Sequence, residues 1–157
     1  PNDHTYIVPA FSGLGAPWWR DDIYASISGM SRTTGREEIV KAGCECIAYQ
    51  INDVIDAMRK DSEIDISQMC VDGGPTRNKY LMQFQSDISQ TEIKIPDAEE
   101  LSVIGAGYLA GESAGYYEPD DIYKAITYNF FETEMPEQER NEKVQGWNEA
   151  VEMLLKK

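Results

Sequence analysis

The feature that most constrains the fold is a long amphipathic helical pattern that follows Thr34. Small and apolar residues recur along it at spacings of three and four, namely Ile39, Gly43, Cys46, Ile47, Ile51, Val54, Ile55 and Met58. That spacing places them on one face of a helix. Residues 34–37 also have the form of a capping box, in which the Thr34 hydroxyl accepts from the first turn and Glu37 reaches back. We therefore predict a helix from this cap to about Arg59, with one face buried.

Short strand patterns and further helical patterns alternate along the rest of the chain. The predicted strands are Tyr6–Pro9, Tyr24–Ser28, Gln68–Val71 and Glu92–Pro96, and the predicted helices are Asn78–Ser89, Ser102–Ala114 and Pro136–Lys157, with a short helix or turn at Asp120–Ile126. This alternation predicts an α/β domain in which helices flank a mixed sheet. Pro96 is typical of an edge strand. Since sheets usually have about five to six strands, we expect the domain to lack its first strands.

The charge of the chain restricts its partners. Its 157 residues carry a formal net charge of −14, whereas proteins that bind nucleic acid or an anionic membrane surface present clusters of Lys and Arg. The chain has neither an apolar run of membrane-spanning length nor a signal-peptide pattern. We therefore expect no nucleic acid and no membrane as partners. A nucleotide is still compatible with the charge, because backbone N–H groups bind phosphate locally.

The cysteines bear on the compartment and on metal binding. Three are present, Cys44, Cys46 and Cys70, and an odd number without framework spacing favours a reducing, cytoplasmic location. The sequence Cys44-Glu45-Cys46 offers one close thiol pair, but the further ligands of a zinc site are missing. Two small residues within a helix are the better interpretation, and we expect no resident metal site.

The best candidate for a functional site follows the strand at residues 68–71. Gly73 and Gly74 lie between that strand and the next helix, where a ligand can approach the main chain without meeting a Cβ atom. The helix that follows offers free N–H groups to adenine, ribose or phosphate. A plain tight turn also explains the glycines. Asn78 likewise has two interpretations, as a contact to a purine edge or as a helix N-cap.

Two other segments have an unusual composition. The helix predicted at residues 102–114 is rich in glycine and alanine, and since glycine destabilises a helix interior, we expect backbone or ligand to approach it closely. The pair Trp18-Trp19 is either a stacking platform or a wedge that holds a loop on the core.

Taken together, the motifs resemble the C-terminal part of the FGGY carbohydrate kinases, closest to the glycerol kinase branch. The resemblance lies in residues 8–19 (VPAFSGLGAPWW), in residues 25–30 with 38–45, and in the segments 72–74, 81–88 and 105–111. Three positions, Gly43, Cys44 and Pro75, depart from the family pattern. Pro75 also removes one N–H from the glycine loop.

The resemblance implies an actin-like, ribonuclease H-like fold in which residues 1–157 form part of the C-terminal nucleotide-binding domain. It further implies an ATP-dependent kinase, working with ATP and Mg²⁺, that phosphorylates a hydroxyl of a sugar or polyol substrate. Gly74 and Asn78 match the family's nucleotide contacts, and Gly73 is adjacent. The catalytic Asp and the substrate pocket belong to segments upstream, so that the missing N-terminal kinase domain is a required partner and the chain is expected to be inactive alone.

Two alternatives to this function are open. One is a kinase for another substrate, such as a pentulose or gluconate. The other is an actin-superfamily nucleotide switch or interaction module without metabolic kinase activity. We also expect that unpaired strand edges of a partial sheet promote formation of a homo-oligomer.

Overall fold

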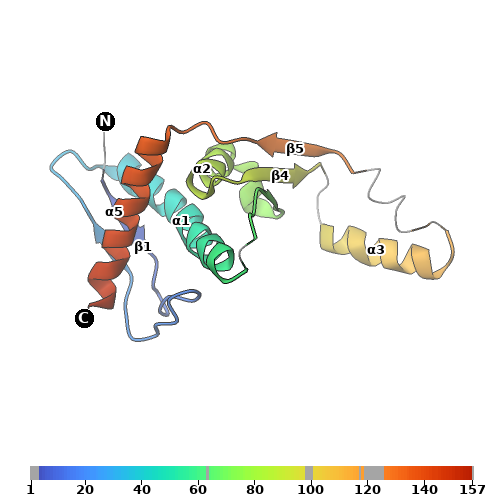
Figure 1. The fold of residues 1–157 in the computed structure, drawn as a ribbon, viewed down its shortest axis with the longest axis horizontal. Helices are drawn as coiled ribbons and strands as arrows, with labels where there is room; N and C mark the ends of the chain where they lie inside the picture. The colour runs from blue at the N-terminus through green and yellow to red at the C-terminus, as the bar shows by residue number, and fades with distance from the viewer. Residues whose placement is uncertain (1–3, 63, 98–100, 117, 119–125, 157) are drawn as a thin grey trace.

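The computed structural model describes residues 4–62, 64–97, 101–116, 118 and 126–156. Its elements in chain order are the strands β1 (Tyr6–Val8) and β2 (Ser26–Ser28), helix α1 (Arg36–Ser62), strand β3 (Gln68–Cys70), the short 3₁₀ helix η1 (Gly74–Arg77), helix α2 (Lys79–Ser89), strand β4 (Glu92–Pro96), helix α3 (Leu101–Ser113), strand β5 (Tyr128–Phe131) and helix α5 (Glu137–Leu155) (Figure 1). The four strands and the four long helices predicted from the sequence are confirmed. The segment predicted at residues 120–126 lies almost wholly outside the described residues, and β5 was not predicted.

The strands form two separate sheets. β1 and β2 pair antiparallel, while β4 lies between β3, to which it runs parallel, and β5, to which it runs antiparallel. The prediction of a mixed sheet is therefore confirmed, but the prediction that β4 is an edge strand is wrong. Pro96 is compatible with the central position because β3 ends opposite Lys94, two residues earlier. Within the described residues β3 is an edge of its sheet, and self-association through such an edge stays a prediction.

The start of α1 differs from the predicted capping box by one residue. The carboxylate of Glu38 accepts from the Gly35 backbone N–H at 2.8 Å, and the Ile39 N–H donates to the Gly35 carbonyl at 3.3 Å. The Thr34 hydroxyl instead accepts from the Ser31 N–H at 2.8 Å. The expected roles of Thr34 and Glu37 are therefore wrong, because the Ser31–Thr34 turn engages the Thr34 hydroxyl and moves the cap to Gly35.

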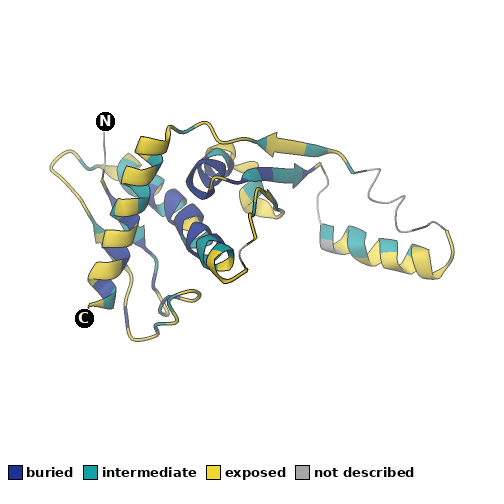
Figure 2. Ribbon diagram, in the orientation of Figure 1, coloured by how far each residue is buried: buried dark blue, intermediate teal, exposed yellow. Residues whose placement is uncertain are grey.

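The core is built around α1, which lies between α2 on one side and β1 and α5 on the other (Figure 1). Tyr49 of α1 stacks on Trp147 of α5 at a centroid distance of 5.1 Å and meets the edge of Phe84 of α2 at 5.4 Å. Figure 2 shows the buried residues gathered on the facing sides of these helices. The inward face predicted for the last helix is confirmed, since Trp147 and Val151 are buried and Val144 packs against the same core.

Helix α3 lies apart from the other helices (Figure 1), and its described residues are exposed or intermediate (Figure 2). A Cβ atom built on Gly105 or Gly107 meets nothing within 4 Å. At Gly105 and Gly107 the described residues therefore leave open space beside the backbone, and close approach by a ligand stays a prediction. Among the helices of the described part of the chain, none has the length and apolarity needed to cross a membrane.

Candidate functional site

The glycine loop begins where β3 leaves its sheet. The Val71 N–H still donates to the Lys94 carbonyl of β4 at 3.0 Å, and the chain then turns at Gly73, whose φ of 102° is in the left-handed region. The Gly73 carbonyl accepts from both the Thr76 N–H, at 3.1 Å, and the Thr76 hydroxyl, at 2.7 Å. A left-handed φ favours glycine. The interpretation of Gly73-Gly74 as a tight turn is thus confirmed, and ligand contact stays a prediction.

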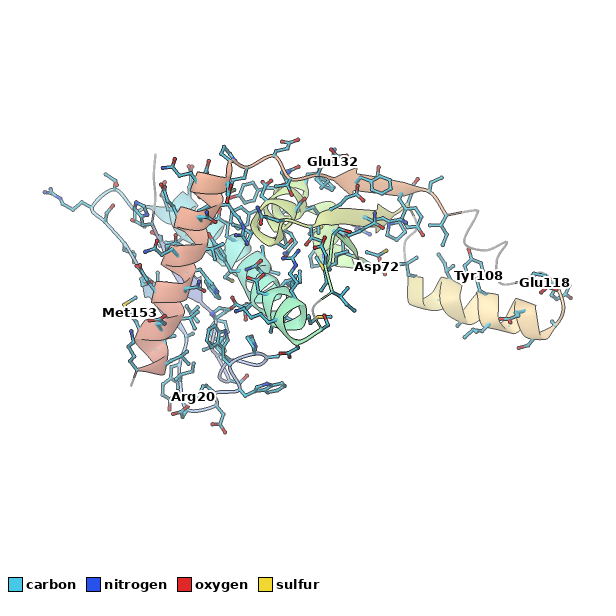
Figure 3. All side chains as sticks on the ribbon, in the orientation of Figure 1. Arg20, Asp72, Tyr108, Glu118, Glu132 and Met153 are labelled. Carbon is cyan, nitrogen blue, oxygen red and sulfur yellow. The ribbon has the colours of Figure 1, made fainter. Side chains whose placement is uncertain are left out.

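The backbone at Gly74 is open. Both glycines are exposed, and a Cβ atom built on Gly74 meets nothing within 4 Å. In the described part of the chain, the amides of Gly73 and Gly74 make no hydrogen bond. The neighbouring Asp72 is exposed and lies on the side of the body nearest α3 in the view of Figure 3. A ligand can therefore reach two free donors at this turn without displacing a side chain.

Asn78 serves as the N-cap of α2. Its Oδ1 accepts from the Leu81 N–H at 3.2 Å, which confirms the capping interpretation. Its Nδ2 donates to Cys44 Sγ of α1 at 3.4 Å. Burial and the nearby Glu45 raise the pKa of the Cys44 thiol, so the sulfur stays neutral at pH 7. Both ends of the Asn78 side chain are thus held, and its orientation is fixed between the two helices.

A groove lies beside Asn78, between the first turns of α1 and the start of α2. Its volume is about 620 Å³, and it is lined by Arg36, Glu37, Val40, Lys41, Cys44, Asn78 and Tyr80. Val40 and Tyr80 give the groove an apolar wall that is open to solvent, while Arg36 and Lys41 bring two positive charges against the one negative charge of Glu37. This composition suits a ligand with one flat apolar part and one anionic part.

Sequence reasoning missed the α1 side of this groove. It selected an apolar stripe whose buried members are Cys46 and Ile55, while Ile47 and Met58 are 40% and 52% exposed, so the predicted buried face is only partly correct. Val40 and Cys44 lie four residues apart on a different face from that stripe. The sequence feature that could have indicated this side of the groove is Val40, an apolar residue that lies outside the stripe. In the structure Val40 is 62% exposed.

The remaining candidates have structural roles. Cys46 donates to the Gly43 carbonyl at 3.2 Å, and the described residues contain no group of three or more His, Cys, Asp or Glu that could hold a metal ion. Trp18 is a wedge, because it packs against the core and donates its indole N–H to Asp53 at 3.1 Å. Trp19 is 77% exposed.

Comparison with known proteins connects this geometry to a family. Residues 1–114 match the model of the FGGY family of carbohydrate kinases, C-terminal domain. The chain is 47% identical over 153 residues to the glycerol kinase of Natranaerobius thermophilus and 42% identical over 156 residues to that of Bacillus subtilis. These alignments cover 96% and 98% of this chain but only 30% and 31% of the relatives, so the chain spans about a third of their length.

Solved structures agree with the sequence comparison. Plasmodium falciparum glycerol kinase, solved with ADP, superposes with a TM-score of 0.88 at 39% identity, covering 98% of this chain and 31% of that one. Gluconate kinase from Lactobacillus acidophilus shares the fold with a TM-score of 0.76 at 17% identity, covering 96% of this chain and 30% of that one. The actin-like fold class predicted from the motifs is confirmed. The chain therefore belongs to the FGGY family of carbohydrate kinases and carries the family's C-terminal domain sequence over residues 1–114.

Proposed function

We propose that the chain is part of an ATP-dependent kinase that phosphorylates a hydroxyl of glycerol or a closely similar polyol. In this proposal residues 1–157 form part of its C-terminal nucleotide-binding domain. The support is the identity of 42–47% to proteins named glycerol kinase over nearly the whole chain. The gluconate and xylulose kinases that share the fold are only 17–22% identical, and they give less support to those substrates.

The proposed nucleotide contacts are Gly73, Gly74 and Asn78. The observation that carries this assignment is the open backbone at Gly74, which lies four residues before Asn78 and its groove. The free glycine amides suit phosphate or ribose oxygens, the positive charge of Arg36 suits phosphate, and the apolar wall suits a base. The ADP in the P. falciparum structure shows that a close relative of this chain binds an adenine nucleotide.

Mg²⁺ is proposed to arrive with ATP. The described residues offer no cluster of carboxylates for it, and Mg²⁺ usually keeps several waters and binds substrate phosphates with few protein ligands. The residues of this chain would hold and orient the nucleotide. The carboxylate that takes the alcohol proton and the polyol pocket are assigned to a partner domain, the N-terminal kinase domain. The three free thiols are the support for a cytoplasmic location.

A glycine-to-alanine pair tests the nucleotide site. Gly74→Ala adds a methyl group that meets no atom within 4 Å beyond the neighbouring residues of its own chain, so it intrudes only on a ligand. We expect calorimetric titration to show ADP binding by the chain, at least about tenfold weaker in the variant, with the melting temperature little changed.

The matched control is Gly105→Ala on α3, where an added Cβ also meets nothing within 4 Å. It should bind ADP as the unmodified chain does. Equal affinity of the Gly74→Ala variant, or no ADP binding by the unmodified chain at millimolar nucleotide, would contradict the proposed site.

A further inference from the structure

The two helices that form the groove are joined by a hydrogen bond beside it. The Tyr80 hydroxyl, from the first turn of α2, donates to Oε1 of Glu45 on α1. Glu45 is only 6% exposed, and the ammonium group of Lys41 lies 3.7 Å from the same carboxylate oxygen. A buried carboxylate needs such partners, because desolvation penalises its charge. The three side chains therefore form one connected group, made of Lys41, Glu45 and Tyr80.

The Tyr80 ring is held on a second side as well. It stacks on Phe84, one turn further along α2, at a centroid distance of 6.0 Å and an interplanar angle of 15°. Burial, followed by the bond to Glu45, raises the pKa of Tyr80, so that the phenol remains a donor at neutral pH. The residue is nevertheless 45% exposed. Its orientation is therefore set by the protein while part of its surface is left open.

Tyr80 also borders two hollows. It lines the groove of about 620 Å³ and, with Lys41, a smaller hollow of about 230 Å³ that contains Glu45 and Phe84. Phe84 and Glu45 thus hold the ring from the smaller hollow, and the ring contributes to the wall of the groove near Asn78. An aromatic ring fixed in this way offers a flat surface for stacking.

We propose that Tyr80 is the base-contacting wall of the nucleotide groove, selective for purines, and that Glu45 is a positioning residue that acts through Tyr80. This inference rests on the proposed nucleotide site and adds the residue that selects the base. A purine presents a larger flat surface to the ring than a pyrimidine does, so loss of the ring should weaken purine nucleotides more.

The test compares ADP with CDP. We expect the unmodified chain to bind ADP more tightly than CDP, and Tyr80→Ala to weaken ADP binding about tenfold, within the range measured for base–aromatic stacking. CDP binding should weaken less, so that the ratio of the two dissociation constants moves toward one. Tyr80→Phe keeps the ring and should keep most of the ADP preference. Tyr24→Ala, which removes a tyrosine that is 81% exposed, is the control and should change nothing.

The role of Glu45 is tested through the same ratio. Glu45→Ala leaves the Tyr80 hydroxyl without its acceptor, so we expect a smaller ADP preference, whereas Glu45→Gln keeps an acceptor and should restore it. Melting curves identify any variant that fails to fold, and Glu45→Gln and Tyr80→Phe then carry the test.

The inference would be overturned by an equal loss of ADP and CDP affinity in Tyr80→Ala, by unchanged affinities, or by an unmodified chain that does not prefer ADP. An equal loss of ADP and CDP affinity, or unchanged affinities, would contradict the role of Tyr80 but not the nucleotide site. Absence of all ADP binding would contradict both proposals.

Discussion

Asp53 is the residue on which three parts of the molecule converge. One of its oxygens, Oδ2, accepts from the indole N–H of Trp18 at 3.1 Å and from that of Trp147 at 2.9 Å, and the residue is only 9% exposed. Because removal of this acceptor leaves two indole donors unpaired in the core, we expect Asp53→Ala to lower the free energy of unfolding by about 2–4 kcal/mol. Urea denaturation measures the loss. The exposed Asp61 supplies the control, and Asp61→Ala should stay within about 0.5 kcal/mol.

Asp53 should also give stability a dependence on pH. Burial raises its pKa above the ordinary value of 3.8, although the two indole bonds lower it. A carboxyl group with a higher pKa in the folded state binds its proton more tightly there. The free energy of unfolding therefore falls as the pH rises from 3.8 through the raised pKa, and this contribution is flat above it.

The variant Asp53→Asn keeps an acceptor and has no charge to bury. We expect its stability relative to the unmodified chain to improve as the pH rises from about 3 to about 7. Urea denaturation at several pH values measures the difference. A difference that does not change with pH would show that Asp53 has the same pKa in both states.

For single residues, the sequence predicted where the candidate site residues lie along the chain better than it predicted which side chains they contact. Gly73, Gly74 and Asn78 were singled out because a strand and a helix flank them, and the structure confirms the turn and the N-cap. The Asn78 bond to Cys44 and the Tyr80 bond to Glu45 each join residues 34 or 35 positions apart. No local pattern encodes such pairs, since they depend on how α1 packs against α2.

Among the elements, α1 gives the sharpest test of local structure. The structure assigns the capping carboxylate to Glu38 and leaves Glu37 exposed. We expect Glu38→Ala to lower the free energy of unfolding by about 1 kcal/mol more than Glu37→Ala does, because only Glu38 satisfies the Gly35 N–H. Thermal unfolding of the two variants measures the difference. A larger loss for Glu37→Ala would favour the capping box predicted from the sequence.

The strands show why element pairing was harder to predict than element position. Tyr128–Phe131 is short, and its alternation is weak, so β5 was missed. Without β5, the only sequence feature that bears on the position of β4 in the sheet is its terminal Pro96, which is typical of an edge strand. The central place of β4 follows from pairing with a strand more than 30 residues later in the chain.

For the molecule as a whole, the expected activity depends on how much of the length of its relatives the chain covers. It spans about a third of the glycerol kinases that it matches. With the catalytic carboxylate and the polyol pocket assigned to the partner domain, we expect no phosphorylation of glycerol by the chain alone in an assay coupled to ADP release. Turnover that scales with chain concentration would contradict that assignment.

Nucleotide binding at the turn after β3 is the proposal from which the others follow. The backbone amide resonances of the isotope-labelled chain, followed while ADP is added, test it at each residue. We expect saturable shifts at Gly73, Gly74 and Asn78, with smaller shifts along the groove at Val40 and Cys44. Saturable shifts confined to other regions, or no shifts at millimolar ADP, would contradict it.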